Sequence, residues 1–229
     1  MSPQRDLPST ATGAIPVVDE AAAVFSSAGA GDTGILLLAD AGAAALRFEN
    51  LECVRRFDGM GWLLGDVGSA TWLGMRTLEA VAADIDRRGP RTALTELVGD
   101  ALGLDLRDGL QPLSPTGDAR RDLVQAVEAL VPDLSPVALG QFASFPGQVP
   151  DDQVARRILD TAIRTFADEV RRLDPDGELP VVLAGSVLSS RGPIHDELVC
   201  GLEADGRDIY VTTLGATPIG GDSEYGARA

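Results

Sequence analysis

The chain has 229 residues, of which 45% are hydrophobic, enough for one large domain or two small ones with a buried core. Its formal net charge is −16, and all 19 basic residues are arginine. Such an acidic surface repels phosphate backbones and anionic lipids, which argues against nucleic-acid and membrane partners. Residues 1–14 are polar and lack the apolar segment of a signal peptide, so we expect them to be disordered and the protein to be cytoplasmic.

The first part of the folded region predicts a helix and three strands. A short apolar run over residues 15–18 ends at Asp19, which is placed to cap a helix over 20–28. Residues 34–39 form a continuous apolar run, typical of a strand buried on both faces. Two further strands, 43–48 and 52–57, read as a hairpin.

The second half of the chain predicts mainly helices, followed by a return to the sheet. Residues 92–131 are mostly helical with glycine breaks, and residues 154–170 place their apolar side chains on one helical face. A strand over 179–184, a helix over 194–202 and a strand over 208–213 close the chain. This order predicts an α/β protein with a mixed sheet flanked by helices.

The most informative segment is residues 59–74, with five glycines, two tryptophans and one carboxylate, Asp66. Glycines at this density let a backbone approach a ligand closely or adopt positive φ. An Ala/Leu/Val-rich helix over 75–85 is expected to follow, which places Asp66 in a loop whose main-chain N–H groups are free to bind polar ligands. The alternative is a tight structural turn with one capping aspartate.

The run 59–74 and the following residues 86–92 resemble a sequence block of the N-acetylglucosamine kinase family, which belongs with the activator ATPases of benzoyl-CoA reductase. Residues 17–23 and 181–188 are similar to two further blocks of that family, in the same order. The resemblance implies a ribonuclease H-like fold of the actin-like ATPase type over residues 15–229. It also implies mostly the second lobe of that fold, with the first lobe largely absent.

The resemblance assigns roles to residues in three blocks. It implies that Asp19 is the catalytic base, and that Asp66, with Gly65 and Gly61, binds the sugar. On the residues alone, Asp19 is equally a helix cap and Asp66 equally a satisfied turn residue.

For the nucleotide, the resemblance implies a phosphate loop at Gly42 and an adenosine site at Gly185, Ser186 and Val187. ATP and Mg²⁺ are the implied cofactors, and no residue is assigned as a metal ligand. Without that context, the second segment is only a turn between a strand and a helix.

Three positions depart from the family pattern. The first phosphate-binding motif of the family has no counterpart here, Asp40 replaces a glycine in the second phosphate loop, and Val67 stands where the family usually has glutamate. Like charges a few ångströms apart in a partly desolvated cleft cost on the order of 1–4 kcal/mol. We therefore expect Asp40 to weaken triphosphate binding unless it points away or binds a cation.

These observations leave two main hypotheses and two weaker ones. The first is ATP-dependent phosphorylation of an amino sugar such as N-acetylglucosamine, with the altered phosphate loops leaving open whether the activity is retained. The second is a non-catalytic sugar-binding or dimerisation module, which predicts a homodimer. An activator-type ATPase with an iron–sulfur cluster is poorly supported, since Cys53 and Cys200 lack metal-ligand spacing and are expected to be buried thiols. A hydrolase is also poorly supported, because the single histidine, His195, is expected at the surface.

Overall fold

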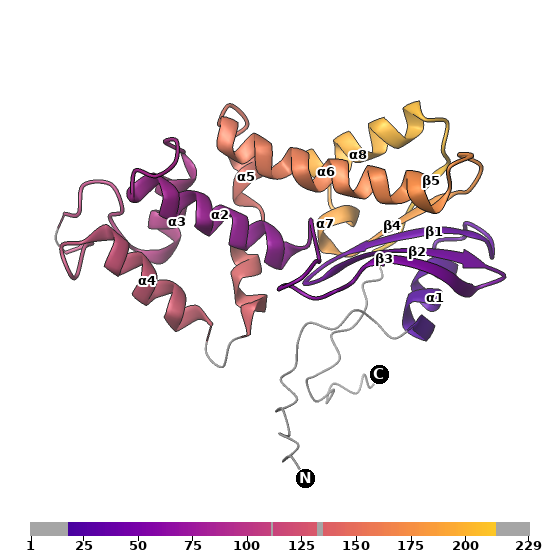
Figure 1. The fold of residues 1–229 in the computed structure, drawn as a ribbon, viewed down its shortest axis with the longest axis horizontal. Coiled ribbons are helices and arrows are strands. Elements are labelled where there is room, and N and C mark those ends of the chain that lie inside the picture. Colours follow the sequence, from indigo (N-terminus) through magenta and orange to yellow (C-terminus); the bar gives the residue numbers. More distant parts are fainter. Residues whose placement is uncertain (1–17, 111, 132–134, 214–229) are drawn as a thin grey trace, which may run out of the picture.

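The core of the protein is a five-stranded mixed sheet with helices on both faces, and further helices extend beyond one end of it (Figure 1). The computed structural model describes residues 18–110, 112–131 and 135–213. The strands lie in the order β3-β2-β1-β4-β5. Their bounds are Gly34–Ala39 for β1, Ala43–Glu49 for β2, Glu52–Asp58 for β3, Val181–Ala184 for β4 and Ile209–Val211 for β5.

Strand β1 lies at the centre of the sheet, and all six of its residues are buried. It pairs antiparallel with β2, Gly34 opposite Phe48, and parallel with β4, Ile35 opposite Val181. The hairpin of β2 and β3 lies on one side and the parallel pair β4–β5 on the other. The predicted strands and the mixed character of the sheet are confirmed. Long apolar runs and a local hairpin are strong sequence signals, which is why these elements could be predicted.

Alternate side chains of the strands enter two separate cores. Ile35, Leu37 and Leu183 belong to the larger core with the helices α2 (Ala70–Ile85), α6 (Gln153–Leu173) and α8 (Pro193–Ala204). Leu36, Leu38 and Phe48 belong to a smaller core, in which Phe48 stacks on Phe25 of α1 (Val18–Ser27) with ring centroids 5.1 Å apart. Figure 1 shows α6 and α8 over one face of the sheet and α1 under the other.

Helix α1 spans Val18–Ser27, so it begins two residues earlier than predicted. Asp19 therefore lies inside the first turn of the helix rather than before it. The apolar run over residues 15–18 ends inside this helix, since Val18 is helical. The rest of that run lies outside the described residues.

Helix α2, Ala70–Ile85, also begins earlier than expected, by five residues. Ser69 is its N-cap, and the hydroxyl of Ser69 accepts a hydrogen bond from the N–H of Trp72 at 3.1 Å. Gly74 is helical, and a Cβ atom there would lie 1.9 Å from the carbonyl oxygen of Leu139. This glycine therefore permits close helix packing, and the glycine loop is limited to residues 59–68.

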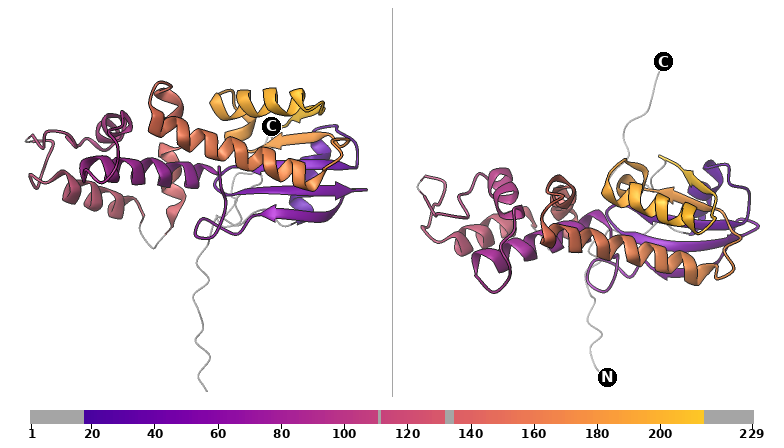
Figure 2. Two further views of the ribbon diagram at one scale, coloured as in Figure 1. Left: turned by 45° about the horizontal axis from the view of Figure 1, so that its top comes forward. Right: turned by 90° about the horizontal axis from the view of Figure 1, so that it is seen from above.

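The remaining helices form the extension beyond the sheet and the cover of its larger core (Figure 2). The extension contains α3 (Leu94–Leu102), α4 (Ala119–Leu130), the 3₁₀ helix η2 (Pro136–Phe142) and α5 (Phe145–Gln148). The cover contains α6 (Gln153–Leu173), the single turn α7 (Ser186–Ser189) and α8 (Pro193–Ala204). The prediction missed η2, α5 and α7, which are short and contain proline, glycine or serine.

Within the described ranges, no helix combines the length and the apolar character needed to cross a bilayer. The α/β fold class with a mixed sheet between helices is confirmed.

Candidate functional site

The carboxyl ends of the parallel strands β1 and β4 lie side by side, and the loops that follow them lie together at this end of the sheet. In open α/β sheets, ligands bind outside the carboxyl ends of the strands, at the point where the strand order reverses. Gly42, predicted to belong to a phosphate loop, lies in the turn between β1 and β2, and Gly185 directly follows β4. Gly185 has φ of 85°, and a Cβ atom there would lie 2.3 Å from the carbonyl oxygen of Ala39. The space that a side chain would need at this position is thus filled by the backbone of β1.

Asp40 joins the two loops. The hydroxyl of Ser186 donates a hydrogen bond to Oδ1 of Asp40 at 2.5 Å. The backbone of Asp40 is also fixed, because its N–H donates to the carbonyl of Gly42 at 2.8 Å and its carbonyl accepts from the N–H of Ala70 at 2.7 Å. Asp40 therefore does not point away from the predicted nucleotide residues but bonds one of them directly.

A pocket of about 430 Å³ opens beside these loops, between η2, α5, α7 and the start of α8. It is within the size range of small-molecule sites. Ser186 and Val187 both line it, whereas Gly42 and Gly185 do not. Most of the other lining residues are small or apolar, and the polar ones among them are Ser144, Gln148, Ser190, Arg191 and His195.

His195 is buried in the wall of this pocket, with 7% of its surface exposed, so the prediction of a surface position was wrong. Its Nδ1 lies 2.6 Å from the carbonyl oxygen of Leu188. Only a protonated Nδ1 can donate to that carbonyl, which leaves Nε2 of the neutral ring as an acceptor. Ile194, Leu198 and Leu202 recur at helical spacing beside His195, which is a weak sequence signal for its burial.

The glycine loop is organised by Asp58, a residue that the sequence reasoning did not select. Oδ1 of Asp58 accepts the N–H of Asp66 at 2.7 Å, and Oδ2 accepts the N–H of Val67 at 2.9 Å. Gly65 is required here, since a Cβ atom would lie 2.0 Å from Oδ1 of Asp58. Gly61 has φ of 78° and forms the turn whose carbonyl accepts the N–H of Gly65 at 2.8 Å. The role of both glycines in the described structure is thus to shape the loop around a carboxylate.

Asp66 is buried, with 2% of its surface exposed, and has φ of 55°. Its Oδ1 accepts the N–H of Gly61 at 3.2 Å. Burial, together with the charge of Asp58, raises the pKa of Asp66 to about 6, against the smaller opposing effect of backbone hydrogen bonds. The cavity beside Asp66 is only about 10 Å³ and is lined in part by Trp62 and Thr71. As described, this space holds about one water molecule and not a sugar.

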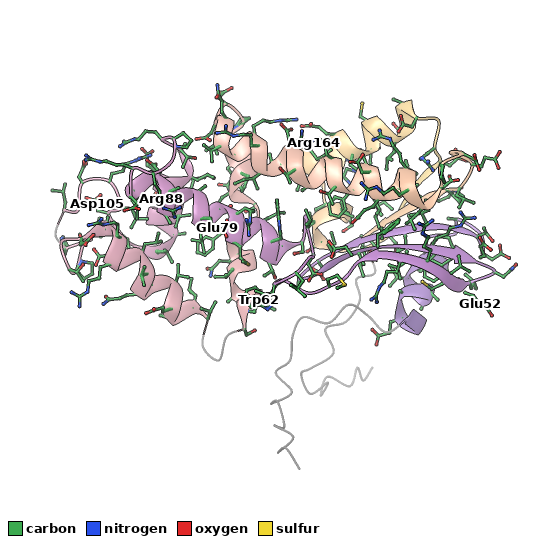
Figure 3. All side chains as sticks on the ribbon, in the orientation of Figure 1. Glu52, Trp62, Glu79, Arg88, Asp105 and Arg164 are labelled. Carbon is green, nitrogen blue, oxygen red and sulfur yellow. The ribbon has the colours of Figure 1, made fainter. Side chains whose placement is uncertain are left out.

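The charge of Asp58 also affects the pKa of a third carboxyl group, Glu169 of α6. Burial, followed by the charge of Asp58, raises the pKa of Glu169 to about 7. Figure 3 shows Trp62 at the junction between the sheet and the helical extension, where the glycine loop meets η2. The loop therefore lies between the sheet and the helical extension and carries two aspartates, Asp58 and Asp66.

The predicted sugar and nucleotide residues lie on two sides of the β1–β2 turn and the first turn of α2. Ala41 lines the cavity of Asp66, while the adjacent Asp40 bonds Ser186. In the first turn of α2, Ala70 lines the large pocket and Thr71 lines the small cavity. The side chain of Asp19, the predicted base, lies outside the described part of the structure.

Among the described residues, no group of three or more His, Cys, Asp or Glu side chains is arranged to hold a metal ion. Cys53 is half-buried and Cys200 is exposed, so the prediction of burial was wrong for Cys200. The residues at the pocket fit the nucleoside part of ATP in size and polarity. They do not fit its phosphates and Mg²⁺, because the group that faces the phosphate-loop position is the carboxylate of Asp40.

Comparisons with known proteins agree with the block resemblance. No family model matches the chain. An N-acetyl-D-glucosamine kinase of Dictyostelium discoideum is 27% identical over 171 residues, which cover 72% of this chain and 50% of that protein. The chain thus spans about half the length of this curated relative.

Two solved structures share the fold. A putative N-acetylglucosamine kinase from Chromobacterium violaceum matches with a TM-score of 0.62 and 23% identity, over 83% of this chain and 60% of that one. A putative N-acetylglucosamine kinase from Porphyromonas gingivalis matches with a TM-score of 0.58 and 17% identity, over 84% and 59%. The sequence match and the shared fold together make this chain a distant homologue of the N-acetylglucosamine kinases over part of their length.

Proposed function

We propose that this chain is the adenine-binding part of an N-acetylglucosamine-kinase-like protein, with the 430 Å³ pocket as its binding site. The observation that carries the proposal is the position of this pocket. It lies at the carboxyl ends of β1 and β4 and is lined by Ser186 and Val187, the residues that the family resemblance associates with adenosine. Its mostly apolar wall with a few polar groups is typical of sites for flat, partly polar ligands.

The polar groups of the pocket support an adenine ligand in particular. His195 lines the pocket with Nε2 as the acceptor nitrogen of its neutral ring, and the side chain of Gln148 offers both a donor and an acceptor. Ser186 lies at the end of the pocket next to the sheet, where a ribose would follow the base. The residues that η2, α5 and α7 contribute to the pocket include Gly140, Gly147 and Ser186, whose small size leaves room for a base.

The second candidate is the full family-level reaction, ATP-dependent phosphorylation of an amino sugar such as N-acetylglucosamine. The sequence match to the Dictyostelium discoideum kinase favours it. Asp66 would bind sugar hydroxyls, with Asp19 as base, and the glycine loop would have to open around Asp66 to admit the sugar. Asp19→Asn and Asp66→Asn should then abolish ADP release in a coupled assay of an active preparation. Unchanged rates in both variants would exclude these roles.

The same fold could serve instead as a non-catalytic sugar-binding or dimerisation module. The side chains of Met60, Leu63 and Leu64 in the glycine loop are 60% to 75% exposed, which favours a surface that is covered in an assembly. Sedimentation velocity would distinguish a homodimer from a monomer, and a stable monomer that binds no sugar would exclude this candidate.

Calorimetric titration of the purified chain with adenosine and, separately, with Mg·ATP tests the proposed pocket. Val187→Trp fills the pocket and should weaken binding of whichever ligand binds by at least about tenfold. Val124→Trp, at an exposed position of α4, is the matched control and should leave binding unchanged. Ser144→Trp enters the same pocket from an exposed position, so it repeats the test if Val187→Trp fails to fold. If the folded wild-type chain binds neither ligand, the proposal is wrong.

A further inference from the structure

We infer that Asp40 makes this pocket selective for a neutral nucleoside and excludes the nucleoside triphosphate. The inference rests on the proposed adenine-binding function and concerns the end of the pocket next to the sheet. Two residues form this end, Ser186 and Ala70, and both are hydrogen-bonded to Asp40. A ligand that extends from the pocket toward the β1–β2 turn therefore meets the carboxylate of Asp40.

The hydrogen bonds at this end of the pocket have one direction. The hydroxyl proton of Ser186 is donated to Asp40, so its oxygen is left to a ligand only as an acceptor. A carboxylate has no proton to donate, and that of Asp40 keeps lone pairs beyond the one that Ser186 uses. Phosphate oxygens are acceptors as well and find no partner here, whereas the hydroxyl groups of a ribose donate and do find one.

Two N–H groups that a phosphate could use at the nearby N-terminus of α2 are already hydrogen-bonded. The N-terminus of α2 faces the pocket through Ala70, and helix N-termini are common anion sites. Here the N–H of Ala70 donates to the carbonyl of Asp40 at 2.7 Å, and the N–H of Trp72 donates to the hydroxyl of Ser69 at 3.1 Å. The backbone of Asp40 thus occupies a donor that would otherwise stabilise a phosphate.

The charges around the pocket add to this effect. Arg191 is the one arginine among the lining residues, its side chain is 87% exposed, and it is paired with Asp196 at 3.1 Å. On the other side of the β1–β2 turn lies a second buried carboxyl group, Asp66, whose cavity Ala41 lines. A triphosphate at this end would approach the carboxylate of Asp40, and the arginine of the pocket is already paired with Asp196, while a neutral nucleoside carries no charge to be repelled.

The test compares adenosine with Mg·ATP by calorimetry on three proteins: wild type, Asp40→Asn and Asp32→Asn. Asparagine at position 40 can still accept the hydrogen bond from Ser186 but carries no charge. Asp32→Asn removes one charge from an exposed carboxylate in the turn before β1, at the amino end of that strand and thus opposite the pocket. We expect wild type to bind adenosine at least about tenfold more tightly than Mg·ATP, which is the size of a like-charge effect at a half-exposed site.

We expect Asp40→Asn to bind Mg·ATP about tenfold more tightly than wild type, with adenosine affinity changed less than about threefold. Asp32→Asn should behave as wild type. Equal wild-type affinities for the two ligands, or a ligand preference that Asp40→Asn leaves unchanged, would overturn the inference while leaving the proposed pocket intact. Binding of neither ligand by wild type would overturn the proposed function and this inference with it.

Discussion

Replacing Asp66 by asparagine should stabilise the protein, and increasingly so as the pH rises. Burial and the charge of Asp58 raise the pKa of Asp66 from its ordinary value of 3.8 to about 6. Below pH 3.8 the carboxyl group is protonated in the folded and the unfolded chain and costs nothing. Between pH 3.8 and about 6 the unfolded chain is ionised while the folded protein still holds the proton on this buried group, so stability is lost over this range and the loss levels off above it. The whole shift corresponds to about 3 kcal/mol at 1.36 kcal/mol per pH unit.

About half of this loss falls above pH 5, where the protein is away from its isoelectric point of about 4.3. We therefore expect the stability advantage of Asp66→Asn over wild type to grow by about 1.4 kcal/mol between pH 5 and pH 8. Urea unfolding of both proteins at half-unit pH steps measures this difference, and the pH dependence of all other groups cancels in it. Asp176→Asn, at an exposed position, is the control and should give a flat difference. A difference that does not change with pH for Asp66→Asn would refute the assignment of a buried, ionising carboxyl group.

Three further predictions concern packing and charge. Gly74→Ala should lower the unfolding free energy by about 1–3 kcal/mol, because its Cβ would lie 1.9 Å from a carbonyl of η2. Gly201→Ala, in α8 with open space around it, should instead raise the free energy by up to about 1 kcal/mol; thermal unfolding compares the two, and equal effects would contradict the packing argument. Arg207→Met should lower the free energy of urea unfolding by about 3–5 kcal/mol, because it removes the arginine that lies 2.6 Å from the buried carboxylate of Asp174. A loss below about 1 kcal/mol would mean that this pair is not buried in solution. Asp58→Asn should lower the pKa of Asp66 in a carboxyl-carbon NMR titration, because the charge of Asp58 raises it; an unmoved pKa would show that burial alone is responsible.

The sheet could be predicted from the sequence because each strand carries its own signal. Residues 34–39 are apolar without interruption, and the two strands that follow are joined by a short local turn. The helix positions were less accurate where glycine or proline occurs inside a helix. Gly74 is predicted as part of a loop, yet it is helical, and glycine is needed there because η2 packs too closely for any side chain. Only the tertiary contact decides between these readings.

The candidate site could be predicted only in part. Ser186 and Val187 were predicted as ligand residues, and both line the large pocket. Asp58 was overlooked, although it precedes Gly59 at the end of a strand, because its role depends on Gly65 folding back against it. The contact of Asp40 with Ser186 joins residues 146 positions apart, and no local pattern encodes such a pairing.

The parallel pairing of β1 with β4 has a consequence for how the chain folds. The antiparallel meander of β1, β2 and β3 can form as soon as residue 58 is synthesised. Ile35 can pair with Val181 only after the intervening helices have been synthesised. Until then β1 presents an unpaired edge of entirely apolar residues, which is the kind of surface that drives association between nascent chains. Pairing over such a sequence separation is also slow, because the loop must close before any contact stabilises it. Growth temperature and chaperone supply should therefore affect the soluble yield of this protein more than they affect the stability of the folded chain.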